Sequence, residues 1–358
     1  MALIDIDALT ADVSPDAPCG ENLIYDAAFL ELDRLAQGTP EQVMGDDVIA
    51  AEEPDWADVA SRAVELLGRS HDLRVTMYLI LAALRLEGLP GLRDGLALLR
   101  RLLETQWEGL YPRLDPEDGN DPTERMNILE SIAQPEGSFG DAVRFIRRLR
   151  EAPLTNSRQL GRLSHRDVQI ACGEVAWPED AEGEPPTLAL IQAAFEDTES
   201  DWLQAQAAAA AEAVEHIEAI DQFLVAAVGA DQAAQLDPFK AALGEVSAVL
   251  AEQLGRRGYS APGAAEAAED TAGAAAAAGP PRQPLRGEIT GPDDVVRALD
   301  RICRYYETHE PSSPVPLLLR RAKRLVSKSF VEVIQELSPQ AMQQIELIAG
   351  IDSGAQPQ

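Results

Sequence analysis

Apolar residues recur every three or four positions along most of the chain, and polar or charged residues fill the positions between them. The first firm stretch follows Glu53-Pro54-Asp55, where a proline and acidic residues suit the first turn of a helix. Its apolar residues share one helical face and stop at Gly68: Trp56, Val59, Ala60, Ala63, Leu66 and Leu67. This spacing predicts a helix over about 54–67.

Three further helices are predicted between 70 and 130. Ser70 is a suitable N-cap for a helix that runs to Gly88, and Pro90 opens a helix that runs to Trp107. Asp121-Pro122 repeats the order of capping residue and proline and opens another helix. Because the connections are short, these helices are expected to pack as antiparallel neighbours.

The segments around these helices are less regular. Residues 1–48 are interrupted by glycine and proline and predict a loop-rich lead-in around one helix near 29–35. Periodicity is weak between 135 and 186, where 168–175 could form either a strand or a buried helical turn. We predict that 1–180 is one antiparallel helical domain.

Two long helices are predicted in the middle of the chain. An alanine-rich pattern covers 188–228, with an interruption at 197–201. Asp237 and the proline after it open a partner helix that ends near Gly255. The two stretches together predict a helical hairpin over 187–257.

The last hundred residues divide into a linker and a small helical unit. Residues 261–284 are almost entirely alanine, glycine, proline and a few polar residues, so a flexible linker is predicted over 258–286. A helical domain is predicted over 287–358, with helices beginning at Pro292 and Leu317. Since this domain is short and has few large apolar side chains, it is expected to complete its core by oligomerising.

The composition agrees with an all-α fold. Apolar residues make up 46% and charged residues 25% of the 358 positions, which is ordinary for a globular protein. Aromatic residues make up only 5%, whereas alanine and leucine, which favour helices over sheets, dominate. At about 150 residues per domain, the length predicts two or three folding units.

Charge is unevenly distributed along the chain. The formal net charge is −31; the stretch from Arg286 to the end has nine bases and ten acids, so −30 lies before it. Such an acidic protein repels nucleic acids and anionic membranes, and neither is expected as a partner. The exception is one predicted helix with five bases and no acid: Arg320, Arg321, Lys323, Arg324 and Lys328.

Two interpretations of this basic helix remain open. It could contact phosphates in a nucleic-acid-binding or regulatory adaptor, or it could pair with acidic residues of the same domain in this or a neighbouring copy. We prefer the second interpretation. It gives a candidate oligomer interface that consists of Leu317, Leu318, Arg320, Arg321, Arg324, Leu325, Phe330, Asp293 and Asp300.

The sequence contains no signal for a membrane or an oxidising compartment. Asp5 and Asp7 stand where a signal peptide needs a basic region and then an apolar run. No segment approaches the roughly 18 uninterrupted apolar residues of a membrane helix. Three widely spaced cysteines suggest reducing surroundings. A cytoplasmic location without direct membrane insertion is expected.

Candidate catalytic residues give weak signals. The stretch from Asp115 to Asp121 is dense in oxygen ligands, but its glycine falls one position early for a calcium loop, so we interpret it as an acidic turn that caps the next helix. Ser70, His71 and Asp72 have the residue types of an acyl-transfer relay, yet neighbours at a helix start point in different directions.

The remaining candidates are isolated or clustered at a helix start. His165 and His216 have no partner of a catalytic type nearby in sequence, and Glu52, Glu53 and Asp55 suit the first turn of a helix. An enzyme would need these acids and the acidic turn to converge around a bound metal. We expect no catalytic residue, no cofactor and no metal.

The N-terminal half contains several short motifs, in the order Pro18-Cys19-Gly20-Glu21-Asn22-Leu23-Ile24-Tyr25-Asp26, Gly45-Asp46, Ala51-Glu52-Glu53-Pro54-Asp55-Trp56, Asp72-Leu73-Arg74-Val75, Leu84-Arg85-Leu86-Glu87-Gly88 and Tyr111-Pro112-Arg113-Leu114-Asp115-Pro116. Together these motifs resemble the ImpA-type N-terminal domain of TssA proteins. The resemblance covers roughly 10–170. Residues 314–322 and the end of the chain also resemble the short class of TssA proteins.

The resemblance implies a structural role in a bacterial type VI secretion system. In the short class the C-terminal unit forms a ring-like multimer that is associated with the baseplate and with priming of the tail sheath. The implied partners are further copies of the chain and the baseplate, sheath and tube proteins. The motif positions expected to be structural or partner-binding are Gly20, Tyr25, Asp26, Pro54, Trp56, Arg74, Pro112 and Arg113.

Overall fold

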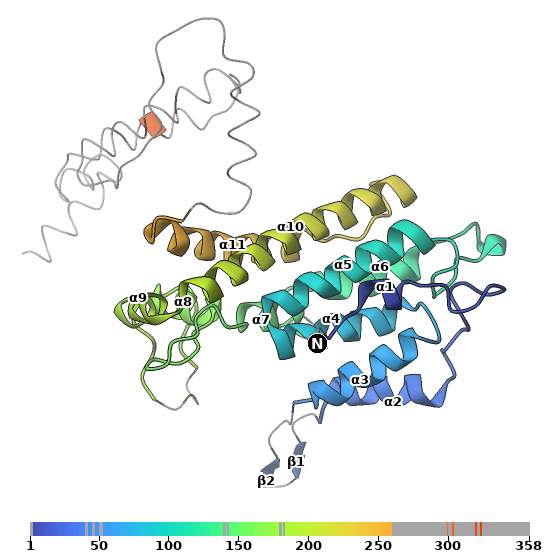
Figure 1. Ribbon diagram of the computed structural model, residues 1–358, viewed down its shortest axis with the longest axis horizontal. Helices are drawn as coiled ribbons and strands as arrows, with labels where there is room; N and C mark the ends of the chain where they lie inside the picture. The colour runs from blue at the N-terminus through green and yellow to red at the C-terminus, as the bar shows by residue number, and fades with distance from the viewer. Residues whose placement is uncertain are drawn as a thin grey trace, which may run out of the picture. The chain divides into compact units, whose positions relative to one another are not determined.

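The structure is a computed structural model, and the chain in it divides into two compact units, Met1–Ala275 and Ala276–Gln358. Their boundary falls within the predicted linker, 258–286. Almost all described residues belong to the first unit, which Figure 1 colours from blue to orange. The structure describes residues 3–39, 42–44, 47–49, 53–138, 141, 143–178, 181, 183–259, 299, 303, 319, 320 and 323.

The described residues form a mainly helical fold, as the sequence predicts. The α-helices are α1 (Ile6–Leu9), α2 (Ala27–Gln37), α3 (Trp56–Leu67), α4 (Leu73–Glu87), α5 (Leu89–Gln106), α6 (Thr123–Glu130), α7 (Phe145–Arg150), α8 (His165–Ala171), α9 (Leu188–Asp197), α10 (Ser200–Val228) and α11 (Asp237–Arg256). Two 3-10 turns, η1 (Pro116–Asp118) and η2 (Ser131–Ala133), flank α6. A hairpin of β1 (Gln42–Met44) and β2 (Asp47–Ile49) was not predicted.

The long helices pack in succession through the first unit. Helix α4 packs between α3 and α5, α5 also packs along α10, and α11 packs against α10 (Figure 1). Helix α4 is the most enclosed, because ten of its fifteen residues are buried. An almost continuous apolar run at 73–84 therefore becomes a central helix with neighbours on several sides.

Two glycines allow α4 and α5 to approach closely. A Cβ atom at Gly91 would lie 2.2 Å from the Ala83 carbonyl oxygen, and one at Gly95 would lie 2.9 Å from Cγ1 of Ile80. The contacts run in opposite sequence directions, so the two helices are antiparallel, as predicted. Only Gly88 separates them; it adopts a φ of 70°, which glycine adopts without a steric cost.

The predicted middle hairpin shares its core with the N-terminal helices. The edge of the Trp107 ring meets Phe223 of α10 at a centroid distance of 5.6 Å. Phe145 of α7 meets Phe239 of α11 in the same way, at 5.7 Å. The helices of 187–257 thus belong to the same compact unit as those of 1–180.

Most helix boundaries agree with the sequence, with one correction. The break expected at 197–201 separates α9 from α10, and α11 begins at Asp237. Ser70 is not the N-cap of α4, because Asp72 takes that position and its carboxylate accepts a hydrogen bond from the Arg74 amide at 2.9 Å. Ser70 is the first residue after Gly68 that is suited to cap a helix, but the turn between α3 and α4 extends two residues further, to Asp72.

The segment left open between strand and helix is helical at its start. Val168 lies in α8, which begins with a capping box between Ser164 and Asp167 and ends at Ala171. The chain then turns through Gly173, whose φ is 78°. Reciprocal capping at Ser164 starts a helix where the apolar spacing alone is too weak to predict one.

Most of the proposed oligomer interface lies outside the described residues. Of its members only Arg320 is described; it is helical and exposed. The positions outside are Asp293, Asp300, Leu317, Leu318, Arg321, Arg324, Leu325 and Phe330. Among the helices that the structure does describe, none is long and apolar enough to cross a membrane.

Candidate functional site

The motif positions gather in two places, and the larger is a cluster of loops at one end of α3, α4 and α5. We call it the loop cluster; it consists of the motif loop 18–26, the turn 68–72 and the segment 107–125. Backbone hydrogen bonds join these three segments: the His71 amide donates to the Cys19 carbonyl at 3.0 Å, and the Tyr111 amide donates to the His71 carbonyl at 2.9 Å. Three sequence-distant loops therefore form one rigid surface.

Gly20 is required by its close approach to the turn. Its φ is 73°, and a Cβ atom there would lie 2.0 Å from the Arg69 carbonyl oxygen. The Gly20 carbonyl accepts a hydrogen bond from the Tyr111 hydroxyl at 3.2 Å. This motif glycine is thus structural, and no other residue fits the position.

The motif loop is fixed on both sides of Tyr25. The Arg69 guanidinium donates to Glu21 at 2.8 Å and to Asp26 at 2.7 Å, and this hydrogen bond is the largest cause of a lowered pKa of Asp26. Asp26 also caps α2 by accepting from the Ala28 amide at 2.8 Å. Between these fixed points the Tyr25 side chain is 89% exposed. The loop therefore presents an aromatic ring to solvent.

A thiol, an imidazole and an amide meet inside the loop cluster. Both the Cys19 thiol, at 3.2 Å, and Nδ1 of His71 contact Oε1 of Gln106. Burial is the main cause of a raised pKa of Cys19 and of a lowered pKa of His71. A thiol and an imidazole that both stay neutral lack the thiolate–imidazolium character of a catalytic pair.

The side chains of His71 and Asp72 have partners outside the triplet Ser70, His71 and Asp72. The Asp72 carboxylate receives two hydrogen bonds from the Arg74 guanidinium, at 3.0 and 2.6 Å, and His71 pairs with Gln106. The Ser70 hydroxyl is buried and has no hydrogen-bond partner among the described residues. Arg74 also lies 4.7 Å above the Phe29 ring, so this motif arginine ties α4 to α2.

One buried charge of the loop cluster, Arg125, was not indicated by the sequence. Arg125 is 1% exposed and donates to the carbonyls of Trp107, Leu110 and Pro112 at 2.7, 2.6 and 2.7 Å. It also lies 4.5 Å above the Trp107 ring, and its burial lowers its pKa to about 10. Backbone acceptors give no signal in a sequence, which is why Arg125 was missed.

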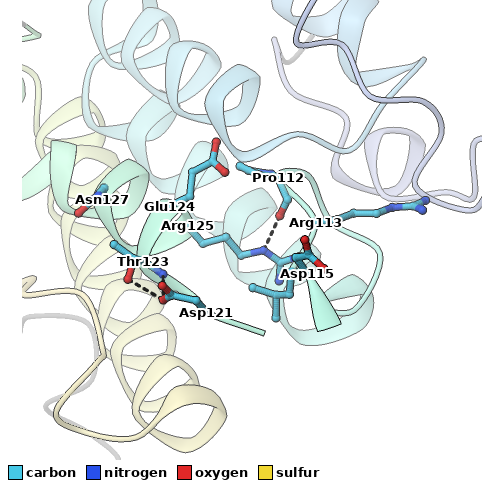
Figure 2. Close-up of a pocket in the computed structure, with 9 residues that line it drawn as sticks. Pro112, Arg113, Asp115, Asp121, Thr123, Glu124, Arg125 and Asn127 are labelled. Atoms are coloured by element: carbon cyan, nitrogen blue, oxygen red, sulfur yellow. Dashed lines mark hydrogen bonds between the residues drawn. The ribbon is translucent and has the colours of Figure 1, made fainter. Parts of the chain in front are cut away.

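A surface cavity of about 370 Å³ opens beside Arg125. Figure 2 shows Arg125 hydrogen-bonded to the carbonyl of Pro112, and the Thr123 hydroxyl bonded to Asp121. Asp121 also accepts from the amide of Thr123, the first residue of α6, at 3.0 Å, while the N-cap position itself is Pro122. In the described part of the chain no three acidic, histidine or cysteine side chains could together hold a metal ion.

A second cavity, of about 500 Å³, opens at the C-terminal end of α5. Its lining includes Cys19 and Gln106 together with three acids, Asp12, Glu104 and Glu108. Arg113 lines both cavities, is exposed and lies 4.8 Å from the Tyr111 ring centroid. The two cavities are open recesses with acidic walls.

The second gathering of motif residues surrounds Glu53. Its carboxylate accepts from Nε1 of Trp56 at 3.1 Å, from Arg85 at 3.0 Å and from Arg148 at 3.1 Å. Burial acts to raise the pKa of Glu53, but the Trp56 hydrogen bond and the two arginines together lower it. Pro54 links this residue to Asp55, the N-cap of α3. Glu53 is therefore a paired structural anion and not a general base.

The two histidines that the sequence left aside are not part of a relay. His165 and His216 each have an Nδ1 atom without a hydrogen-bond partner among the described residues. Burial lowers the pKa of both side chains. They are neutral residues of the helical packing.

The chain is similar to proteins of type VI secretion systems. Residues 10–134 match the family described as ImpA, N-terminal, type VI secretion system. The type VI secretion system component TssA1 of Pseudomonas aeruginosa is 42% identical over 98% of this chain and all of its own length. A solved N-terminal domain of the TssA component from Burkholderia cenocepacia, which includes the ImpA_N region, has the same fold: its TM-score is 0.57 and its identity 22%, over 73% of this chain and 97% of that domain.

Proposed function

Since this chain belongs to the TssA family of type VI secretion system components, we propose that it is a baseplate-associated scaffold that helps to prime or coordinate polymerisation of the tail sheath and tube. It acts without catalysis or a cofactor, through contacts with other copies of itself and with baseplate, sheath and tube proteins. Assembly takes place in the cytoplasm. The proposal combines an oligomeric C-terminal domain with acidic helical domains that bind partners.

The proposal is supported by the contacts of the motif residues: most of them hold loops in place, and one is exposed to solvent. In the loop cluster Gly20, Asp26 and Pro112 hold loops in place through backbone contacts or a helix cap, while Tyr25 is held outward in solvent. Large exposed aromatic side chains on rigid loops are frequent energetic centres of protein interfaces. The motif thus supports recognition of a protein partner and provides no reaction centre.

The role of the C-terminal domain rests on charge and size. Its 73 residues from Arg286 carry a net charge of −1, in contrast to −30 for the rest of the chain. A nearly neutral domain can associate with its own copies without the repulsion that the acidic domains experience. The basic helix that contains Arg320 and Arg324 would pair with acids such as Asp293 and Asp300 across subunits.

Light scattering after size exclusion tests the scaffold. We expect the full chain to form a large closed multimer, and a chain that ends at Ala275 to be monomeric, because the first unit has its own core. A monomeric full chain at micromolar concentration would contradict the proposal. In that case the basic helix would be tested as the site of a nucleic-acid-binding or regulatory adaptor, with salt-dependent binding to duplex DNA as the measurement.

A further inference from the structure

The β1–β2 hairpin extends from the helical body between α2 and α3 (Figure 1). Its strands pair antiparallel with Gln42 opposite Ile49, Val43 opposite Val48 and Met44 opposite Asp47. Among the described residues the sheet has no third strand. An isolated two-stranded hairpin is at best marginally stable in water, and its outer edges can pair with another strand.

Both ends of the segment that carries the hairpin are fixed to the helices. At the N-terminal side α2 ends at Gly38, whose amide donates to the Leu35 carbonyl at 3.1 Å. At the C-terminal side the carboxylate of Glu53 is held by Trp56, Arg85 and Arg148. The motif around Pro54 and Trp56 thus anchors the chain directly after the hairpin.

The register indicates which backbone groups face outward. In an antiparallel ladder, residue pairs alternate between those that exchange hydrogen bonds and those that do not. Met44 and Asp47 flank a two-residue connection, where the hydrogen-bonded pair is expected. The amides and carbonyls of Val43 and Val48 then point to the two free edges, where a third strand can bind.

The charge of this segment determines what kind of strand can bind. Between Arg34 and Arg62 the sequence has seven acids and neither lysine nor arginine. Two copies of the hairpin would repel each other, because like charges on paired strands are unfavourable. A strand with lysine or arginine beside its apolar residues is attracted to the same edge.

We propose that the β1–β2 hairpin is a docking edge for an extended, basic segment of a partner protein, which adds a third strand beside Val43 or Val48. Backbone hydrogen bonds supply the affinity, and the acidic surroundings select the partner. This inference rests on the proposed scaffold function, since it assigns one of the partner contacts that a scaffold requires. It differs from the Tyr25 surface, which lies before α2.

A synthetic peptide tests the docking edge on the full-length protein. The probe has three valines that alternate with two threonines between pairs of lysines, with a fluorophore at one end, and binding is followed by anisotropy. The control peptide has glutamates in place of the lysines. We expect saturable binding of the lysine peptide, and at least tenfold weaker binding of the glutamate peptide.

Matched substitutions identify the edge. Val43→Pro and Val48→Pro each remove one outward amide, a change that an edge strand tolerates, and Val48→Thr keeps the amide and the β-branched shape. We expect one proline variant to weaken binding at least tenfold, and Val48→Thr to change it less than twofold. Loss in both proline variants but not in Val48→Thr would also place the peptide on the hairpin.

Three results would overturn the docking edge: no binding of the lysine peptide up to millimolar concentration, equal binding of the two peptides, or wild-type binding by both proline variants. The light-scattering test of the scaffold is independent of these results. If the protein is multimeric but fails the peptide test, only the hairpin proposal is contradicted. If the protein is monomeric but binds the peptide, the scaffold proposal is contradicted and the docking edge is supported.

Discussion

The α4–α5 pair and the loop cluster lie next to each other but are stabilised in different ways. Between α4 and α5 the contact is apolar and close, with Gly91 and Gly95 against the backbone and side chains of the facing helix. In the loop cluster the contacts are polar: Arg125 donates to backbone carbonyls of its own segment, 107–125, and Arg69 of the turn donates to the Glu21 carboxylate of the motif loop.

The apolar repeat therefore determines how the helices pack, whereas individual polar contacts determine the shape of the loop surface. The helix pair follows from the apolar repeat, because burying leucine and alanine stabilises any helix with the right spacing. The loop cluster depends on individual side chains that satisfy buried backbone groups, and a single missing donor leaves several acceptors unpaired. Motif residues therefore concentrate in the loops and not in the helix interiors.

The largest effect on stability is expected when the Arg125 side chain is removed from the loop cluster. In Arg125→Ala three carbonyls lose their donor, and we expect the free energy of unfolding to fall by about 3 kcal/mol or more. Urea denaturation measures the change. Arg101→Ala on the exposed face of α5 is the matched control and should stay within about 0.5 kcal/mol of wild type. Equal stability of the two variants would show that water replaces the guanidinium.

The corresponding test of the helix pair is a single added methyl group. Gly91→Ala places a Cβ atom 2.2 Å from the Ala83 carbonyl oxygen and should cost about 1–3 kcal/mol, because the helices must move apart. Gly244→Ala in α11 meets no atom within 4 Å and should instead stabilise the protein by up to about 1 kcal/mol. Thermal unfolding of both variants compares them, and destabilisation of the same size in both would contradict close packing as the cause.

The same contrast explains which features the sequence could predict. Helices α3, α4 and α5, the break before α10 and the start of α11 follow from apolar spacing, glycine and proline, and all were predicted. The hydrogen bond from the Thr123 amide to Asp121 is also local in sequence. These features need no knowledge of which segments meet in space.

The polar contacts of the loop cluster and those around Glu53 could not be predicted, because they either reach backbone carbonyls, as Arg125 does, or join segments that are distant in sequence. Cys19 and Gln106 are 87 residues apart, and Arg148 and Glu53 are 95 apart. The motif resemblance indicated Gly20, Trp56 and Arg74 as important without their reasons. The β1–β2 hairpin was missed because its strands are only three residues long.

A pH titration separates the two regions further, because the loop cluster buries His71, whereas α4 and α5 contain no histidine. Burial lowers the pKa of folded His71 below its unfolded value of about 6.5, so protonation favours unfolding. Stability should be complete above about pH 6.5 and fall as the pH is lowered, by at most about 1.4 kcal/mol per pH unit for this histidine. His165 and His216 act in the same direction.

His71→Asn isolates the contribution of the loop cluster, since its side-chain amide can donate to Gln106 in place of Nδ1 and cannot be protonated. We expect denaturant midpoints of wild type and variant to differ in their pH dependence between about pH 7 and 5, with the shallower slope in the variant. Parallel slopes would mean that His71 titrates alike in folded and unfolded chains. Far-UV circular dichroism at each pH confirms that both start folded.

The smallest effect on stability is expected where the loop cluster meets solvent, and there the effect on function should be largest. Tyr25 is 89% exposed, so Tyr25→Ser should change the free energy of unfolding by less than about 0.5 kcal/mol. The loop stays in place, because Arg69, Asp26 and Gly20 hold it without the ring. A loss of secretion in a strain that has only this variant would then come from a lost contact and not from a misfolded protein.

Tyr259→Ser is the matched control, because this tyrosine is also exposed, at 41%, and lies outside the motif. If Tyr25 marks a partner surface, its variant should lose type VI-dependent secretion at wild-type protein levels, while the Tyr259 variant keeps it. Normal secretion by both would confine the motif loop to a structural role. Its conformation would then serve the packing of α2, α3 and α4, and the partner surface would lie elsewhere on the acidic helical unit.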